Sequence, residues 1–282
     1  MARLLFLTPQ VPYPPHQGTT IRNYNLIVHL SADYEVHLLS FQQANDEPPG
    51  NSPLLRYCSV AETAPAPQRS MLRRAATTAL SASPDMALRL ASDTFQARLG
   101  MLLERHRYDV VQIEGIEMAP YGLWLTSHPL WRSARSKADL PGIPIGRPRL
   151  IFDDHNAEYV LQQRAWETDL RKATRWHAAA YSAIQWQKLK RYERQVCHSA
   201  DRVVVVSDAD RAALLRLDPK LDITVVPNGV DLAFYDAYNC ELDPAPPDYG
   251  DNALVFTGKM DFRPNIDAVV WFVEQVLPRV QA

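Results

Sequence analysis

The stretch that decides the fold is Arg-Val-Val-Val-Val-Ser-Asp-Ala-Asp, from Arg202 to Asp210. Its four consecutive valines predict a strand that is covered on both faces, because such strands are continuous apolar runs. Ser207, followed three residues later by Asp210, is typical of the start of a helix. Leucines after Asp210 provide the apolar face of that helix. A strand that leads directly into a helix is the repeating unit of a parallel α/β sheet.

The same alternation recurs along the chain. Short apolar runs predict further strands at Leu4–Thr8, Glu35–Ser40, Arg56–Val60, Asp109–Glu114, Leu150–Asp153, Ile223–Val226 and Leu254–Thr257. Helical periodicity predicts helices over Thr19–His29, Phe95–Arg107 and Glu158–Cys197, the last of which is either continuous or broken. The fold class is therefore α/β, with parallel strands joined by crossover helices.

Composition narrows the class of protein. The chain has 282 residues, of which 46% are hydrophobic and 22% charged, as in folded soluble proteins. Lys plus Arg is 30 and Asp plus Glu is 32, so the net charge is −2 and no nucleic-acid partner is expected. The cysteines at 58, 197 and 240 are far apart and form no zinc motif, which favours a reducing cytosol.

The densest polar cluster is Asp153-Asp154-His155-Asn156-Ala157-Glu158. It directly follows a predicted strand, where open α/β sheets hold their ligands, so we expect His155 to belong to a site. Two alternatives remain open for its neighbours. Asp153 and Asp154 could bind a divalent metal through oxygen, or Asp154 or Asn156 could cap the next helix.

A second candidate site lies between the first predicted strand and the helix that begins near Thr19. Gly18 has no Cβ and lets a phosphate or sugar approach the backbone, while the helix start offers free N–H groups. The alternative is a glycine that only the turn requires. Glu114 ends another strand and would either hydrogen-bond a sugar hydroxyl or cap the turn at Gly115. The sequence contains neither a dinucleotide fingerprint nor a P-loop.

At Val226-Pro227-Asn228-Gly229-Val230-Asp231 the sequence resembles the V-P-N-G-V-D segment of the family 4 (group 1) glycosyltransferases, which have the GT-B fold. Other segments follow in the family's order. The Pro-rich loop before Gly18 resembles the acceptor-side loop, and Asp153–Asn156 resembles the strand-end histidine segment. Phe256–Asp261 looks like the first strand and turn of the nucleotide-binding domain. Residues 261–272 are similar to sugar transferases of bacterial exopolysaccharide loci.

The resemblance implies two Rossmann-like domains across a cleft, the first for the acceptor and the second for a nucleotide-sugar donor. It implies transfer with retention of configuration, no metal, and no cofactor, since the nucleotide sugar is a substrate. His155 would be catalytic through a hydrogen bond to the transferring sugar. Substrate would be bound by Gly18, Thr19, Glu114, Asp154, Asn156, Asn228 and Gly229. The donor diphosphate would be bound by Gly258, Lys259 and Arg263.

The same resemblance sets the expected domain boundaries. Residues 1–240 would form the acceptor-side domain, 241–251 a Pro-rich linker, and 252–282 the first βα unit of the donor domain, so that the chain is truncated at its C-terminus. The family's paired glutamates have no match here. Pro264-Asn265 stands where the family often has Lys-Gly.

The sequence thus predicts a hexosyltransferase of polysaccharide biosynthesis, inactive in this truncated form, that acts on a glycan or lipid-linked acceptor. An acceptor-binding module without transfer activity and a GT-B nucleotide-sugar epimerase are the alternatives. We expect a cytoplasmic protein at the inner face of the membrane. An anionic membrane surface is a candidate partner because residues 69–107 hold seven arginines against three acidic residues. The basic stretch from Arg164 to Arg194 is either a solvated helix face with tryptophans in the core or a surface helix that rests on anionic lipid.

Overall fold

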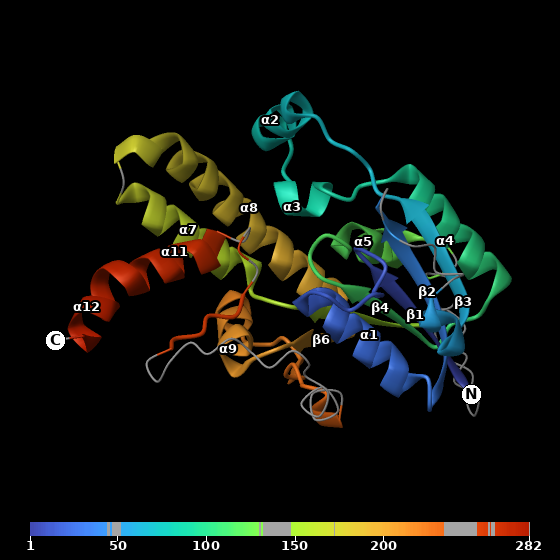
Figure 1. Cartoon of the computed structure of the whole chain (residues 1–282). Coiled ribbons are helices and arrows are strands. Elements are labelled where there is room, and N and C mark those ends of the chain that lie inside the picture. Colours follow the sequence, from blue (N-terminus) through green and yellow to red (C-terminus); the bar gives the residue numbers. More distant parts are fainter. Residues whose placement is uncertain are drawn as a thin grey trace. The chain divides into compact units, whose positions relative to one another are not determined.

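The computed structural model describes residues 1–43, 46, 52–129, 131, 148–171, 173–233, 253–258, 260 and 263–281. Seven parallel strands form one sheet in the order β3-β2-β1-β4-β5-β6-β7 (Figure 1). The strands are β1 (Ala2–Thr8), β2 (Tyr34–Gln42), β3 (Cys58–Pro65), β4 (Val110–Glu114), β5 (Arg149–Asp154), β6 (Arg202–Val205) and β7 (Ile223–Val225). The predicted α/β class and parallel sheet are confirmed.

Helices connect the strands on both sides of the sheet. They are α1 (Gly18–Leu30), α2 (Met71–Leu80), α3 (Asp85–Leu88), α4 (Asp93–Arg105), α5 (Ala119–Ser127), α7 (Glu158–Leu170), α8 (Trp176–Ser199) and α9 (Asp208–Leu217), with short 3-10 turns η2 (Pro53–Arg56) and η3 (Ala173–Arg175). The helix predicted over Glu158–Cys197 is therefore a pair of helices, α7 and α8. Among the helices described, none has the length and apolarity to cross a bilayer.

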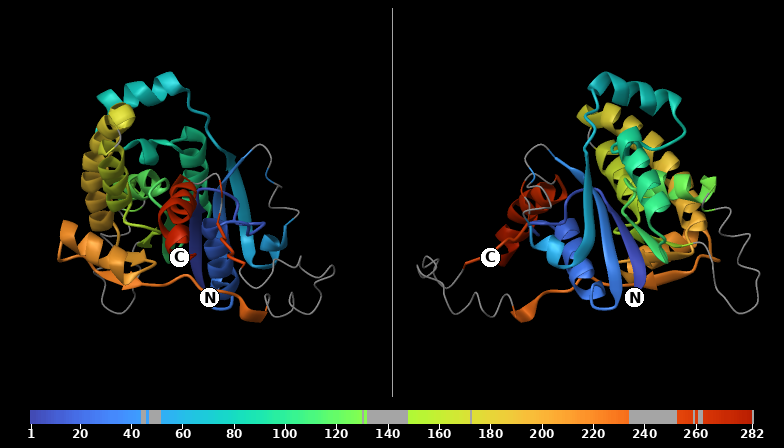
Figure 2. Two further views of the ribbon diagram at one scale, coloured as in Figure 1. Left: turned by 60° about the vertical axis from the view of Figure 1, so that its left-hand side comes forward. Right: turned by 90° about the vertical axis from the view of Figure 1, so that its right-hand side faces the viewer.

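Alternation along β1 divides the core between the two faces of the sheet. Leu4 and Phe6 pack with Ile27 of α1, whereas Leu5 and Leu7 belong to the cluster that covers the other face. That second cluster includes residues of α4, α5, α8 and α9. Figures 1 and 2 show α1 on one side of the sheet and α4 and α5 on the other. Both faces of β1 are buried, as its continuous apolar sequence requires.

The βα unit of β6 and α9 forms as its sequence predicts. β6 ends at Val205, and the Ser207 hydroxyl accepts a hydrogen bond from the Asp210 N–H at 3.1 Å. Ala213 and Leu214 of α9 are buried against the sheet. Because β6 lies between β5 and β7, this βα unit extends the sheet from the strand that carries His155 at its end.

The strand order reverses between β1 and β4, since β2 and β3 lie on one side of β1 and β4 to β7 on the other. Loops that leave the carboxyl ends of strands at such a point diverge to opposite faces of the sheet. The resulting crevice is where open α/β sheets bind ligands. In this chain it lies between the ends of β1 and β4.

The chain divides into a unit of Met1–Gly229 and a unit of Val230–Ala282. The second unit contains α11 (Arg263–Trp271), a π-helical turn η4 (Phe272–Val276) and α12 (Leu277–Val280). The strand predicted over Leu254–Thr257 is wrong. An extended segment becomes a strand only by pairing with another strand, and no described segment pairs with it. The linker predicted at 241–251 lies outside the described residues.

Gly122 permits the close approach of α5 to the sheet. A Cβ at Gly122 would lie 2.5 Å from Cδ1 of Ile113, which is fully buried. We expect Gly122→Ala to lower the free energy of unfolding by about 1–3 kcal/mol, because the core must shift to admit the methyl group. Urea unfolding measures the change.

Gly100→Ala is the matched control, since it also lies within a helix. Its Cβ would meet Trp124 at an ordinary 3.8 Å. That substitution should stabilise the protein by about 0.5–1 kcal/mol, because alanine favours helix over glycine. Equal effects of the two substitutions would contradict the packing described here.

Candidate active site

A polar cavity of about 270 Å³ opens at the carboxyl ends of β1, β4 and β5. Its lining residues are Pro9, Gln10, Gln17, Thr19, Gln43, Arg89, Leu90, Glu114, Glu117 and His155. Two of the predicted strand-end residues, Glu114 and His155, and the predicted helix-start residue Thr19 thus meet at one place. The cavity coincides with the reversal of strand order, where the topology alone places a ligand.

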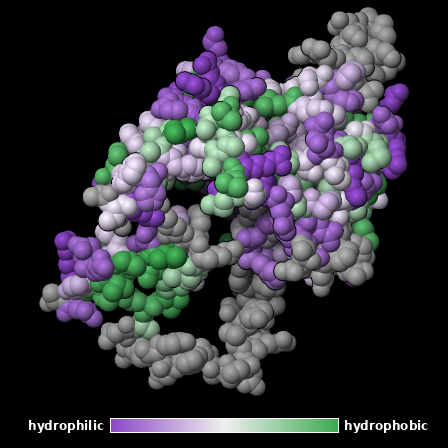
Figure 3. Space-filling model, turned by 90° about the horizontal axis from the view of Figure 1, so that it is seen from above, coloured by the Kyte–Doolittle hydropathy of each residue, from purple (hydrophilic) through white to green (hydrophobic). Residues whose placement is uncertain are grey.

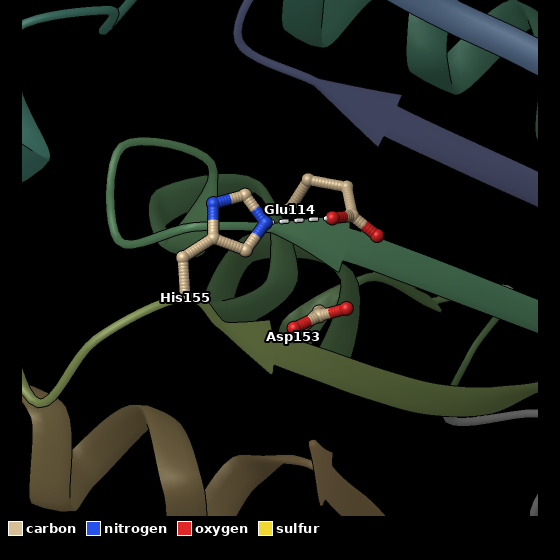
Figure 4. A group of neighbouring side chains, drawn as sticks. All are labelled: Glu114, Asp153 and His155. Carbon is tan, nitrogen blue, oxygen red and sulfur yellow. Dashed lines mark hydrogen bonds and ion pairs between the residues drawn. The ribbon is translucent and has the colours of Figure 1, made fainter. Parts of the chain in front are cut away.

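His155 and Glu114 form the central pair of the site. Nε2 of His155 lies 2.9 Å from Oε2 of Glu114 (Figure 4). Nε2 of Gln112 donates to the other Glu114 oxygen at 2.6 Å. Glu114 is fully buried, whereas His155 keeps 17% of its side chain exposed. Because Glu114 engages Nε2, the remaining ring nitrogen, Nδ1, is the one with which His155 can bind a ligand.

The backbone turns sharply after β4, beside His155. Gly115 has a φ of 78°, a conformation that favours glycine. A Cβ there would lie 3.3 Å from Oε2 of Glu117 and 3.8 Å from Nδ1 of His155. The turn that follows Glu114 therefore requires a glycine for its conformation, while a Cβ there would be tight only against Glu117 and would meet His155 at an ordinary distance.

The charge of the pair depends on its surroundings. Burial alone would lower the pKa of His155, but the hydrogen bond to Glu114 and the negative charges of Glu114 and Asp153 outweigh burial and raise it. The imidazolium form is thus favoured relative to a free histidine. In that form Nε2–H donates to Glu114 and Nδ1–H is available as a second donor.

A buried ion pair lies beside this site. Nε and Nη2 of Arg22, on α1, donate to Oδ2 of Asp153 at 3.1 and 2.8 Å. Asp153 is fully buried and Arg22 is 8% exposed. Burial, followed by the charge of Glu114, raises the pKa of Asp153 to about 7, while His155 and Arg22 act in the opposite direction. Arg22 therefore stabilises a carboxylate that burial would otherwise neutralise.

Arg22 also reaches the end of the sheet. Its Nη1 donates to the Val226 carbonyl and to Oδ1 of Asn228, both at 3.0 Å. Asn228 and the exposed Gly229 are the last two residues of the first unit of the chain. One guanidinium thus joins α1, the end of β5 and the segment that follows β7.

Glu114, Asp153 and His155 also have the ligand chemistry of a cation site, with donor atoms within 4.8 Å of one another. Two of these donors are already engaged, His155 by Glu114 and Asp153 by Arg22. The Arg22 charge beside Asp153 opposes a second cation there. The arrangement is better explained as a hydrogen-bonded pair next to an ion pair than as a metal site.

Asp154 faces the other side of β5 and does not line the cavity. It is 1% exposed, and the charged groups that act on it are carboxyls, with Glu193 of α8 the strongest. Burial and these negative charges raise the pKa of Asp154 well above its usual range. Alternation along the strand explains the difference, because adjacent residues point to opposite faces.

Glu193 holds the start of α7. Its two carboxylate oxygens accept the backbone N–H groups of Glu158 and Tyr159 at 2.7 and 2.8 Å, and Asp210 accepts that of Ala157 at 3.0 Å. Helix capping by Asp154 or Asn156 is therefore not what the structure shows. Burial raises the pKa of Glu193 to about 8 and that of Glu158 to about 7.

The other predicted residues are more scattered. Gly18 starts α1, has no positive φ and leaves open space where a Cβ would lie, so its turn does not require a glycine. Asn156 is exposed in the loop after His155. In the second unit Gly258 is exposed, and Arg263 is the first residue of α11. Lys259 lies outside the described residues, so the diphosphate site remains a prediction.

Sequence reasoning missed several residues of the site. Arg22 lies four residues, or one helical turn, after Gly18, and that spacing was the available signal. Gln112 lies two residues before Glu114 on the same strand and hence on the same face. Arg89 and Glu117, which pair at 3.3 Å, come from loops whose position no local pattern indicates.

A parallel sheet with a polar cavity where its strand order reverses defines a class, the Rossmann-like α/β domains that bind a ligand at the carboxyl edge of the sheet. Within that class the sequence identifies the family. Residues 17–234 match the profile of Glycosyltransferase Family 4. The match covers more than half of the chain, which therefore belongs to Glycosyltransferase Family 4.

Several solved structures are similar to this chain at low identity. Sucrose-phosphate synthase from Thermosynechococcus elongatus is 13% identical, with a TM-score of 0.39 over 84% of this chain and 98% of that chain. Phytolacca americana UGT2, complexed with UDP-2-fluoro-glucose and pterostilbene, is 12% identical, with a TM-score of 0.43 over 84% and 57%. A UDP-glucosyltransferase from Polygonum tinctorium is 9% identical, with a TM-score of 0.43 over 82% and 53%. This chain thus spans little more than half of the two plant proteins. No curated protein matches its sequence.

We expect Arg22→Gln to lower the free energy of unfolding by about 3–5 kcal/mol, because it leaves Asp153 buried without its cation. Arg3→Gln is the control: Arg3 pairs with Glu35 at the same 2.8 Å, but the two side chains are 29% and 32% exposed. Its loss should cost less than about 1 kcal/mol. Urea unfolding of both variants at neutral pH makes the comparison, and equal losses would contradict the role given to burial.

Asp154→Asn tests the buried acids beneath the site. Because folding raises the pKa of Asp154, the folded chain binds a proton that the unfolded chain releases above about pH 4. The stability that this bound proton contributes is fully present below about pH 4 and is lost as the pH rises through the pKa of Asp154 in the folded protein. The asparagine variant has no titratable group at this position and so cannot lose this contribution.

Between about pH 5 and 8, the free energy of unfolding should therefore fall less for Asp154→Asn than for the wild type. A difference of at least about 1 kcal/mol at the upper end corresponds to one pKa unit. Denaturant unfolding across this range gives the values, with the exposed Asp33→Asn as control. If the free energy of unfolding changed with pH in the same way for all three proteins, the raised pKa of Asp154 would be contradicted.

Proposed function

We propose that the protein expressed from the full reading frame transfers a hexosyl residue from a nucleotide sugar to a hydroxyl of a glycan or lipid-linked acceptor, with retention of configuration, in polysaccharide biosynthesis, and that the 282-residue chain alone is inactive. The observation that carries the proposal is the His155–Glu114 pair, which lies in a polar cavity of a Glycosyltransferase Family 4 chain. The GT-B architecture and the resemblance to exopolysaccharide-associated enzymes belong to the same proposal.

The cavity suits a single sugar residue. Its volume of about 270 Å³ lies below the range of about 300–1,000 Å³ that drug-sized ligands occupy. Side-chain amides of Gln10, Gln17 and Gln43 and the Thr19 hydroxyl line it, and each can both donate and accept hydrogen bonds. Such groups match the hydroxyls of a sugar ring, which also donate and accept.

In the proposed reaction the bond between sugar C1 and the diphosphate oxygen breaks, and a bond from the acceptor oxygen to C1 forms on the same face. The acceptor proton leaves with the diphosphate, so the reaction needs no cofactor. His155 donates a hydrogen bond to the transferring sugar, and Glu114 keeps its ring oriented and charged. Lys259, Arg263 and the Gly258 backbone hold the diphosphate, where positive charge stabilises the leaving group.

The proposal also covers where the reaction takes place. A lipid-linked acceptor lies at a membrane, so we propose a cytoplasmic protein that associates peripherally with the inner face. The test of function uses the protein expressed from its full reading frame and a panel of UDP- and GDP-sugars. Turnover of one donor, with an NMR assignment of the product anomer as that of the donor, is the expected result.

Other outcomes separate the alternatives. Acceptor binding with no turnover of any donor would favour the acceptor-binding module. Conversion of a nucleotide sugar without an acceptor would favour an epimerase. An inverted product would overturn the retaining mechanism.

His155→Gln should lower kcat by about 10²-fold, as expected for removing one preorganised donor from a charged reaction centre. His29→Gln, an exposed histidine of α1, is the matched control and should leave kcat unchanged. The initial rate of donor consumption at saturating acceptor measures both. An unchanged rate in His155→Gln would remove this residue from the reaction.

Glu114→Gln separates orientation from charge. Since the Glu114 carboxylate raises the pKa of His155, its removal lowers that pKa. The limb of the pH–rate profile that depends on the protonated histidine should then move to lower pH. A profile that keeps its midpoint while kcat falls would show that Glu114 acts only by position.

A further inference from the structure

Helix α2 is docked with its polar face inward. Positions 73, 74, 77 and 78 lie on one side of the helix, while positions 71, 72, 75, 76, 79 and 80 lie on the other. The first set is Arg, Arg, Thr and Thr, and the second is Met, Leu, Ala, Ala, Ala and Leu. No residue of α2 is buried.

The polar side is where α2 attaches to the rest of its unit. Nη2 of Arg74 pairs with Asp85 at 3.0 Å, and Nη2 of Arg69 donates to the Thr77 hydroxyl at 2.6 Å. From α8, Nζ of Lys188 donates to the Thr78 carbonyl at 2.6 Å. Hydrogen bonds and ion pairs therefore fix the orientation of the helix, in place of apolar packing.

The apolar side consequently faces outward. Met71 is 75% exposed, Leu72 85% and Leu80 88%. Figure 3 looks onto this side of the molecule from above and shows hydrophobic side chains at the surface. Ile184 of α8 is 46% exposed and lies one helical turn from Lys188, so it borders the same surface. Exposed apolar surface that the fold positions in this way is typical of a docking face.

The charge around this face identifies its partner. Of the three arginines in residues 66–84, Arg69 and Arg74 pair with the buried Asp85, whereas Arg73 is exposed. Residues 173–192 of the neighbouring η3–α8 segment contain no acidic residue and include the exposed Lys190 and Arg191. Arg73 lies at the border between the two sides of α2, at nearly the same angle around the helix as Leu80 and two turns before it. A short apolar helix face flanked by arginines suits the interface of an anionic bilayer, where both the leucines and the arginines gain free energy.

We propose that α2 is an interfacial membrane anchor, with Met71, Leu72 and Leu80 inserted among acyl chains and Arg73 at the level of anionic headgroups. The membrane-binding surface itself consists of α2 and its neighbours on α8 and does not depend on the proposed function. Only its use, to bring a lipid-linked acceptor to the cavity, rests on the proposed function. The orientation is fixed before binding, so little ordering accompanies insertion.

The test is sedimentation with vesicles of about three parts phosphatidylcholine to one part phosphatidylglycerol at roughly 0.1 M salt. The wild type should bind. The double variant Leu72→Glu, Leu80→Glu should bind at least about tenfold more weakly, since each leucine contributes burial and each glutamate is repelled. Leu55→Glu is the control, an exposed leucine on η2, and should bind as the wild type does. Both leucines of α2 are exposed, so the fold should persist, which circular dichroism checks.

Arg73→Gln should weaken binding to the anionic vesicles by about fivefold and leave the weak binding to pure phosphatidylcholine unchanged. Failure of the wild type to bind anionic vesicles would overturn the proposal. So would equal binding of the wild type and the double variant. Self-association that the double variant abolishes, without vesicle binding, would instead assign the face to a second copy of the chain. Transfer to a water-soluble acceptor, measured separately, should not change in the double variant, which separates this proposal from that of function.

Discussion

The ion pair of Arg22 with Asp153 is the interaction on which the site depends. It places a cation from α1 beneath the carboxyl end of β5, in a position where Glu114 and Asp153 would otherwise leave two carboxylates together in a buried environment. Removing either charge from such a pair leaves the other uncompensated. The same guanidinium donates to the Val226 carbonyl and to Asn228. Arg22 therefore links the segment after β7 to the site.

The opposite face of β5 supports His155 in a different way. Glu193 of α8 holds the first N–H groups of α7, and the buried Asp154 lies against it. The loop from Asp154 to Ala157 is thus fixed at both ends: Asp154 is buried at its start, and Glu193 holds the first turn of α7 at its end. His155 projects from that loop to Glu114 of β4, which Gln112 of the same strand fixes by a hydrogen bond. A ring held in this way is preorganised to present one nitrogen to a ligand.

Much of this arrangement could be predicted from the sequence, because β-branched runs and strand-end polar clusters are local patterns. The valines before Ser207 predicted β6 and its helix, and His155 and Glu114 were both predicted at strand ends. The assignment of Asp154 to substrate could not be corrected locally, since it depends on which face of β5 meets α8. Arg22 and Arg89 were missed because their partners are distant in sequence. The strand predicted at Leu254–Thr257 failed because a strand depends on a neighbour as well as on its own residues.

The central claim is that His155, oriented by Glu114, contacts the sugar of the donor. NMR of the protein with labelled histidine tests this claim directly, because the imidazole signals of His155 report both its contacts and its protonation. A nucleotide sugar that supports turnover should shift the His155 signals, while the bare nucleotide leaves them in place. Turnover of a donor that leaves the His155 signals unchanged at saturation would contradict the account.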